Sequence, residues 1–217
     1  MKKFAIVLSG NGVYDGSEIH EAVLTMLAIK RQSCDYQCFA PDIPQHHVIN
    51  HLNGEEMNEK RNVLTESARI ARGNIKKLSE FVANEFDALI FPGGFGVAKN
   101  LSTFAFDGAD ASVNEDVRKA VMEMHKNKKP IGALCIAPAM IAKIVGHEVN
   151  VTIGNDDSTA NAIEQMGAIH IDTDHADVVL DEENLIFTSP CYMLDADISQ
   201  IYDGAYNTVE AMIKMME

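Results

Sequence analysis

Residues 3–10, KFAIVLSG, form a short continuous apolar run that ends at a glycine. A run of this kind is typical of a strand buried on both faces of a sheet. Residues 17–31, SEIHEAVLTMLAIKR, then place most of their apolar side chains near one face of a helix. Residues 36–41, YQCFAP, read as a second buried strand. A strand, a helix and a second strand in this order predict a parallel sheet covered by helices.

The remaining chain continues the alternation of strands and helices. Asn53-Gly54 lies between two extended pieces, which predicts a small β-hairpin outside the main sheet. The sequence therefore predicts one domain over residues 1–217, an α/β sandwich with a mostly parallel, doubly wound sheet and functional sites at the carboxyl ends of strands. The patterns predict helices at 62–72, 78–84, 113–127, 137–145, 158–167 and 197–216, and further strands within 87–96, 130–135, 149–154, 168–172, 177–181 and 184–190.

Composition and charge narrow the possible partners. The 217 residues are 47% hydrophobic and 23% charged, as in globular proteins, and the net charge is −14. That charge argues against nucleic acid and anionic membrane surfaces as partners. The five apolar residues FAIVL near the start are too few for a secretory signal, and no run approaches the ~18 apolar residues of a membrane span. We expect a soluble, cytoplasmic protein.

The cysteine and histidine spacings do not indicate a metal or a disulfide framework. No CxxC pair is present, so we expect reduced thiols at Cys34, Cys38, Cys135 and Cys191. His47, His51 and Glu55 have the spacing of metal ligands on a helix, but Asn53-Gly54 argues against a helix there. We expect no metal and no cofactor.

The strongest local signal for chemistry is residues 131–138, IGALCIAP, which place Cys135 between a predicted strand and a predicted helix. At such a turn a side chain is presented to solvent, and the helix N-terminus lowers the pKa of a thiol. The neighbouring residues are small enough for a crowded turn. Cysteine is also among the most buried residue types, so the pattern alone leaves a nucleophile and a core residue equally open.

A glycine pair and two carboxylates lie on segments that could approach Cys135. Gly93 and Gly94 follow a predicted strand, where their amides could form an oxyanion hole. Asp15 and Glu18 have the spacing of a capping box, which would explain Glu18 as a structural residue. Glu21 has no such explanation. Helical periodicity does not decide which of the two glutamates faces a cleft.

Two competing readings remain open at this point. Gly10, Gly12 and Gly16 loosely resemble a dinucleotide-binding fingerprint, although the third glycine is out of place. Cys191, at the end of another predicted strand, could be a rival nucleophile or a resolving thiol for Cys135.

Several segments together resemble the ThiJ/PfpI class I glutamine-amidotransferase-like superfamily. They are LSGNGVYDGSEIHEAVLTMLAI (8–29), FPGGFGVAKNLSTFA (91–105), CIAPAM (135–140), VTIGND (151–156) and TSPCYML (188–194). The resemblance implies a flavodoxin-like three-layer sandwich, Cys135 as the nucleophile, Glu21 as its carboxylate partner with Glu18 as the fallback, and a homodimer. Related members are described as glutathione-independent glyoxalases and are linked to isoprenoid biosynthesis.

The sequence departs from the superfamily pattern directly after Cys135, where Ile136 stands in place of a frequent histidine. This argues against glutamine hydrolysis. Our leading hypothesis is that the Cys135 thiolate attacks a small aldehyde, amides of Ile136 and of the Gly93-Gly94 loop hold the oxyanion, and Glu21 moves a proton. The alternative is a non-catalytic redox or stress-responsive protein with an oxidisable, low-pKa Cys135.

Overall fold

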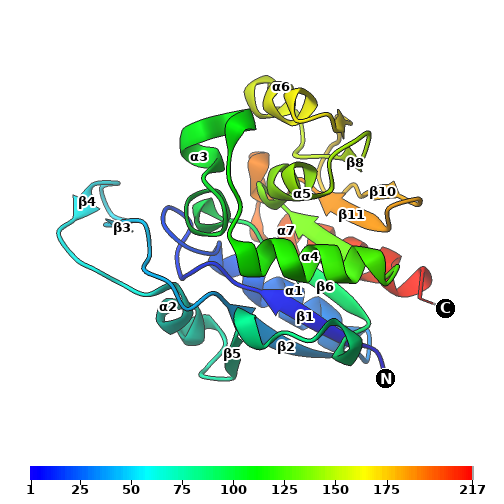
Figure 1. Ribbon diagram of the computed structural model, residues 1–217, viewed down its shortest axis with the longest axis horizontal. Coiled ribbons are helices and arrows are strands. Elements are labelled where there is room, and N and C mark those ends of the chain that lie inside the picture. The colour runs from blue at the N-terminus through cyan, green and yellow to red at the C-terminus, as the bar shows by residue number, and fades with distance from the viewer. Residues whose placement is uncertain (217) are drawn as a thin grey trace.

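A seven-stranded sheet between two layers of helices is the centre of the computed structural model, which describes residues 1–216 (Figure 1). Every strand pair in it is parallel except β10–β11, which is antiparallel. The predicted α/β sandwich with a mostly parallel, doubly wound sheet is therefore confirmed. In spatial order the strands are β10 (Val179–Asp181), β11 (Ile186–Ser189), β7 (Ile131–Leu134), β6 (Ala88–Phe91), β1 (Lys3–Val7), β2 (Asp35–Ala40) and β5 (Ile75–Lys77).

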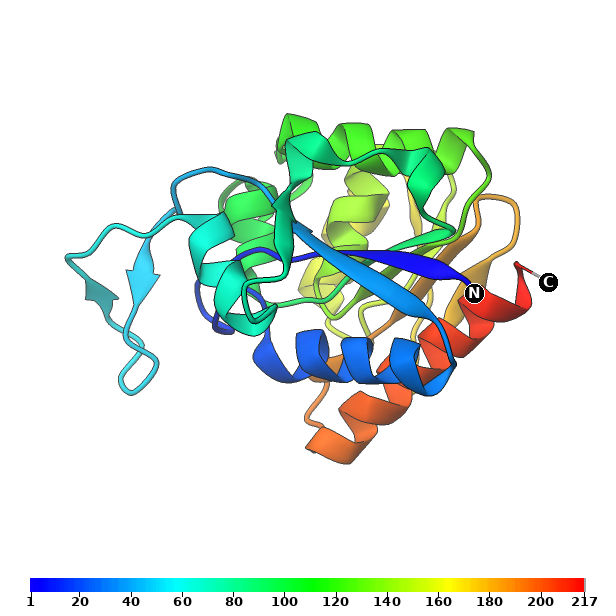
Figure 2. The same cartoon turned by 90° about the horizontal axis from the view of Figure 1, so that it is seen from below.

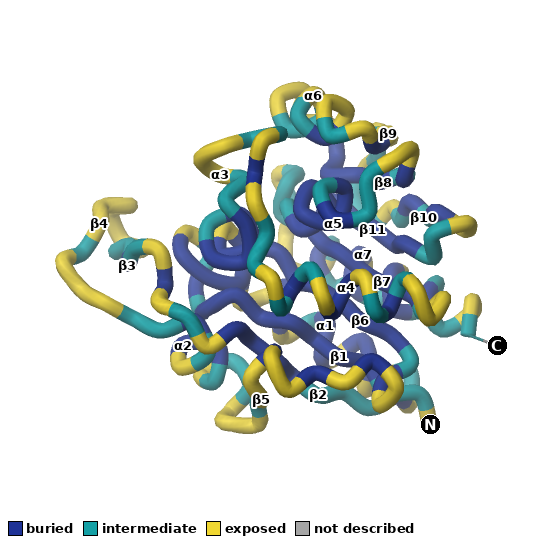
Figure 3. Tube along the Cα trace, viewed as in Figure 1, coloured by how far each residue is buried: buried dark blue, intermediate teal, exposed yellow. Residues whose placement is uncertain are grey.

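Helices cover both faces of this sheet. Figure 2 shows α1 (Ile19–Arg31) and α7 (Ile198–Lys214) side by side on one face, and α4 (Glu115–Lys126) lies on the other. The sheet is buried and the helices bury the side that faces it, whereas loops at the periphery are exposed (Figure 3). The other helices are α2 (Val63–Ile70), α3 (Phe104–Asp107), α5 (Ala137–Val145) and α6 (Asp157–Gln165).

Strand β1 shows why its sequence is apolar throughout. Phe4 and Ile6 pack into the core shared with α1 and α7. Ala5 and Val7 point to the opposite face, into the core shared with α4 and α5. Because successive side chains of a strand point to opposite faces, a central strand covered on both sides has no polar face.

The predicted hairpin is confirmed as a separate antiparallel pair of β3 (Val48–Ile49) and β4 (Glu56–Met57). Asn53 and Gly54 lie in the loop between them, with Gly54 at φ +76°. The hairpin projects from the body of the molecule (Figure 2). A further two-stranded sheet pairs β8 (Asn150–Val151) with β9 (Ile169–His170).

The helix predicted at 78–84 is wrong. Strand β5 adds to the edge of the sheet beside β2, and two 3₁₀ turns follow it. Phe81 and Phe86 stack on each other and meet Phe39 edge-on, so this segment packs its rings against the sheet without forming a helix. The 3₁₀ turns span Leu78–Glu80, Ala83–Glu85, Gly108–Asp110 and Cys191–Met193, and a π-helical turn spans Val97–Leu101.

Candidate active site

The carboxyl ends of β6 and β7 bring the glycine pair next to Cys135. The two strands are paired with Phe91 opposite Ala133, so the segments that follow them start side by side. Cys135 comes directly after β7 and has φ +60°, a left-handed conformation that is uncommon for a residue other than glycine. Helix α5 begins two residues later. The predicted strand-to-helix turn at Cys135 is therefore present.

The environment of the thiol differs from the expectation. Cys135 is only 7% exposed, and burial together with the nearby Glu21 raises its pKa well above the ordinary value. Hydrogen bonds from the backbone amides of Gly94 and Ile136 act in the opposite direction without outweighing burial. The prediction of an exposed, low-pKa thiol is wrong. The turn at the start of the helix is closed off from water, and loss of hydration destabilises the thiolate and raises the pKa of the thiol.

Glu21 is the carboxyl group that lies next to Cys135. Its side chain is fully buried and makes a side-chain hydrogen bond with Cys135. Its Oε2 accepts the backbone N–H of Gly93 at 2.8 Å, and its Oε1 accepts that of Tyr192 at 3.2 Å. Burial first, and the charge of Glu18 second, raise the pKa of Glu21 to about 8. Glu21 therefore holds a proton near neutral pH beside the sulfur.

Glu18 has a structural role, but not the expected one. It is the N-cap residue of α1, and its Oε2 accepts the backbone N–H of Glu21 at 2.7 Å. Asp15 does not cap the helix. Its carboxylate accepts the N–H of Ile49 at 2.7 Å and ties the first loop to the hairpin. The expected capping box is therefore wrong, and Glu18 holds the start of the helix that carries Glu21.

Gly93 and Gly94 are glycines because other groups occupy the space of a side chain. A Cβ on Gly93 would lie 2.3 Å from Cys135 Cβ and 2.7 Å from Glu21 Oε2. A Cβ on Gly94, which has φ +96°, would lie 2.3 Å from the backbone nitrogen of Glu18. The glycine pair thus allows the thiol, the carboxyl group and the start of α1 to meet.

The backbone amides around the Cys135 sulfur differ from the expected set. Those of Gly94 and Ile136 hydrogen-bond the sulfur of Cys135. The Gly93 amide donates to Glu21, so it orients the carboxyl group and does not face the sulfur. The expected donor set of Ile136 and the Gly93-Gly94 loop is reduced to Ile136 and Gly94.

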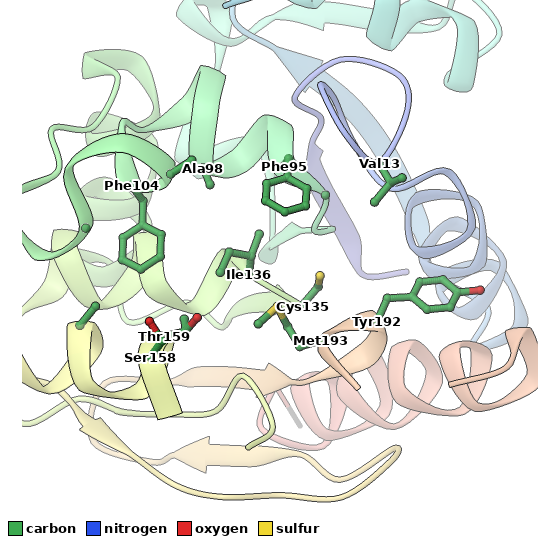
Figure 4. A pocket seen from close by; sticks show the side chains of 14 residues that line it. Val13, Phe95, Ala98, Phe104, Cys135, Ile136, Ser158, Thr159, Tyr192 and Met193 are labelled. Atoms are coloured by element: carbon green, nitrogen blue, oxygen red, sulfur yellow. The ribbon is translucent and has the colours of Figure 1, made fainter. Parts of the chain in front are cut away.

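A pocket of about 500 Å³ opens onto the thiol. In Figure 4, Cys135 and Tyr192 lie on one side of Ile136, and Phe104, Ser158 and Thr159 lie on the other. The lining residues are uncharged and largely apolar. They are Val13, Gly94, Phe95, Ala98, Phe104, Ala105, Gly108, Cys135, Ile136, Ser158, Thr159, Ala162, Tyr192 and Met193.

Tyr192 is a site residue that the sequence analysis missed. Its amide holds Glu21, its side chain lines the pocket, and its hydroxyl lies 2.8 Å from Nδ1 of His20. It follows β11, the neighbour of β7 in the sheet. Its position after a parallel strand, in the segment TSPCYML, was the signal that could have identified it.

The structure does not support the dinucleotide-binding and metal-binding interpretations of the sequence. The amide of Gly10 donates to Ser67 Oγ, that of Gly12 to Ser17 O, and that of Gly16 to Gly12 O, so this loop does not present these three amides to a phosphate. His51 accepts the N–H of Tyr14, and His47 lies 3.1 Å from Lys99 Nζ. Within residues 1–216 no group of three or more His, Cys, Asp or Glu side chains is arranged to hold a metal ion. All four cysteines are free thiols.

The comparisons with known proteins identify the family. The model of the DJ-1/PfpI family matches residues 12–191. The chain therefore belongs to the DJ-1/PfpI family. The superfamily of this name includes enzymes.

Two curated relatives and a crystal structure are similar over almost the whole chain. The "ES1 protein homolog, mitochondrial" of Rattus norvegicus is 46% identical over 98% of this chain and 82% of its own. The human "Glutamine amidotransferase-like class 1 domain-containing protein 3, mitochondrial" is 45% identical over 98% of this chain and 83% of its own. An ElbB-like protein from Ehrlichia chaffeensis, named "isoprenoid biosynthesis protein with amidotransferase-like domain", superposes with a TM-score of 0.94 at 38% identity over the full length of both chains.

More distant structures share the fold alone. DJ-1beta of Drosophila melanogaster has a TM-score of 0.57 at 15% identity, covering 99% of this chain and 90% of its own. Among the helices formed by residues 1–216, none combines the length and apolar character needed to cross a membrane.

Proposed function

We propose that this protein is a cofactor-independent glyoxalase, which converts 2-oxoaldehydes such as glyoxal and methylglyoxal to 2-hydroxy acids. The observation that carries the proposal is the contact between the Cys135 thiol and a fully buried Glu21 whose pKa is about 8, next to a pocket. A nucleophile beside a carboxyl group that exchanges protons near neutral pH is the pair that this rearrangement needs.

The first step is attack of Cys135 sulfur on the aldehyde carbon. The pair of Cys135 and Glu21 releases a proton, and the C–S bond forms while the carbonyl π bond breaks. The charge that develops on oxygen lies beside the amides of Gly94 and Ile136, which already hydrogen-bond the sulfur. The oxygen takes up the proton that remains on the pair, which gives a hemithioacetal and leaves Glu21 as a carboxylate, and no electron carrier is involved.

Glu21 then moves a proton between the two carbons of the substrate. As a carboxylate it removes the proton from the carbon bonded to sulfur, which gives an enediolate, and it returns the proton to the adjacent carbon while the hydroxyl proton passes from the first oxygen to the second. The result is a thioester of the 2-hydroxy acid. Water cleaves the C–S bond, releases the acid and restores the thiol, so the net change is addition of one water molecule. The amides of Gly93 and Tyr192 fix the carboxyl group in this role.

Two other activities are less consistent with the site. Glutamine hydrolysis by a Cys-His-acid triad lacks the histidine after the nucleophile, because Ile136 occupies that position. The redox alternative depended on an exposed thiol that oxidants reach from solution, and Cys135 is only 7% exposed.

Incubation of the purified protein with glyoxal or methylglyoxal, without glutathione, tests the proposal. We expect glycolate or lactate by proton NMR from the wild type, and none above background from Cys135→Ala. Equal product from the two proteins would show that Cys135 is not the nucleophile. The homodimer, the cytoplasmic location and the link to isoprenoid biosynthesis remain proposals, tested respectively by light scattering, cell fractionation and metabolite analysis of a deletion strain.

A further inference from the structure

The pocket beside Cys135 is large for the smallest 2-oxoaldehydes. Its volume is about 500 Å³, within the range of roughly 300–1,000 Å³ found for pockets that bind drug-sized molecules. Glyoxal and methylglyoxal have only a few non-hydrogen atoms each, and both react at the thiol. Most of the pocket therefore lies beyond the reacting carbons.

The residues that line the rest of the pocket indicate which substituent of a substrate it binds. Phe95, Phe104 and Ile136 supply apolar surface to the pocket, with Phe104 and Ile136 on the side of the thiol that faces Ser158 and Thr159 of α6 (Figure 4). Ala162 of α6 also lines the pocket. None of these apolar residues can pair with a charged group. Burying an apolar group here is favourable. The polar side chains at this end of the pocket are the hydroxyls of Ser158 and Thr159, and the acidic residues Asp156 and Asp157 at the start of α6 disfavour a phosphate or carboxylate beside them.

We infer that the substrate is a 2-oxoaldehyde with a bulky, uncharged apolar substituent of at least the size of a phenyl ring. This inference rests on the proposed function. The aldehyde carbon reacts with Cys135, and the substituent extends past Ile136 towards Phe104 and the first turns of α6. The small aldehydes leave this part of the pocket unfilled.

Phenylglyoxal, which forms mandelate, and methylglyoxal, which forms lactate, are suitable probes. Filling the pocket with a ring predicts a kcat/KM for phenylglyoxal at least about tenfold above that for methylglyoxal. Since the two aldehydes also differ in intrinsic reactivity, the decisive quantity is how variants change this ratio.

Ala162→Leu is the test variant, because Ala162 is half-buried, lines the pocket and lies on a helix that accommodates leucine. Ala160→Leu is the matched control, since Ala160 is half-buried on the same helix but is not part of the lining. We expect Ala162→Leu to lower the ratio of the two kcat/KM values about tenfold. Ala160→Leu should leave the ratio unchanged, and circular dichroism confirms that both variants are folded.

A ratio that Ala162→Leu does not change would overturn the inference. Binding to Cys135→Ser separates it from the proposed function, because binding needs no turnover. Tighter calorimetric binding of mandelate than of lactate, reduced by adding Ala162→Leu, supports the apolar pocket even if neither aldehyde is converted. Equal binding of the two acids would contradict it.

Discussion

Two cysteines in this protein occupy similar turns and differ in what surrounds them. Cys135 and Cys191 follow the neighbouring parallel strands β7 and β11, and both have positive φ, +60° and +43°. Both are buried, and burial raises the pKa of both thiols. Cys135 additionally contacts the Glu21 carboxyl group, two amides and the pocket, whereas Cys191 is not part of the pocket lining. A strained turn alone does not make a nucleophile, since the groups that converge on the sulfur define its chemistry.

The largest expected effect is the contrast between the two alanine variants. Cys135→Ala should lower 2-oxoaldehyde turnover at least about 1,000-fold, because the covalent step is lost. Cys191→Ala should stay within about threefold of the wild type, since this thiol lies outside the pocket lining. Steady-state kinetics on both variants measure the contrast. A comparable loss of turnover in Cys191→Ala would show that the two thiols do not differ in function.

Glu21→Gln should lower kcat at least about 100-fold, because the amide cannot exchange the proton. The buried position is kept, although one of the two amides from Gly93 and Tyr192 loses its acceptor. Glu18→Gln is the comparison variant: it keeps an oxygen for the Glu21 amide and removes a charge that raises the pKa of Glu21. Its pH–rate profile should shift to lower pH with kcat largely retained. An active Glu21→Gln enzyme would exclude the acid/base role.

Gly93→Ala should lower kcat/KM about 100-fold by displacing Cys135 and Glu21 from each other. Gly73→Ala is a control at an exposed glycine with open space around it, where only the positive φ is strained. Kinetics and thermal unfolding of the two variants separate damage to the site from loss of stability. Normal activity in Gly93→Ala would contradict the contact between these groups.

The smallest effect concerns stability and pH. The pKa of Glu21 is raised in the folded protein, so the folded state binds more protons and loses stability as pH rises from about 4.5 to about 8. Between pH 6 and 8 the stability of the wild type relative to Glu21→Gln should fall by about 2 kcal/mol. Urea unfolding at several pH values measures this difference. A difference that is constant over this range would mean that Glu21 is ionised throughout.

Much of the fold was predictable because buried strands and amphipathic helices have local signatures. Helix α5 begins and ends at the residues expected from the sequence, 137–145. The segment 78–84 was not predictable in the same way, because Phe81 and Phe86 are buried by contact with Phe39, which is distant in the sequence. Apolar spacing in a short segment does not distinguish a helix from turns that pack against a sheet edge.

The residues of the candidate site were predicted, but the pKa of the thiol was not. The resemblance identified Glu21, and the structure shows its contact with Cys135. The raised pKa of the thiol depends on how completely β6, β11 and α1 enclose it, which the sequence does not show. The same is true of the exchange of roles between Gly93, which holds Glu21, and Gly94, which faces the sulfur.

The central claim is that Cys135, and not Cys191, is the thiol through which this protein reacts. Labelling of the folded protein with a limiting amount of iodoacetamide, followed by peptide mass spectrometry, compares the two thiols within one sample. Cys135 should be labelled at least about tenfold faster, because it lines the pocket and the amides of Gly94 and Ile136 favour its thiolate, whereas Cys191 is not part of the pocket lining. Equal labelling, or faster labelling of Cys191, would contradict the account.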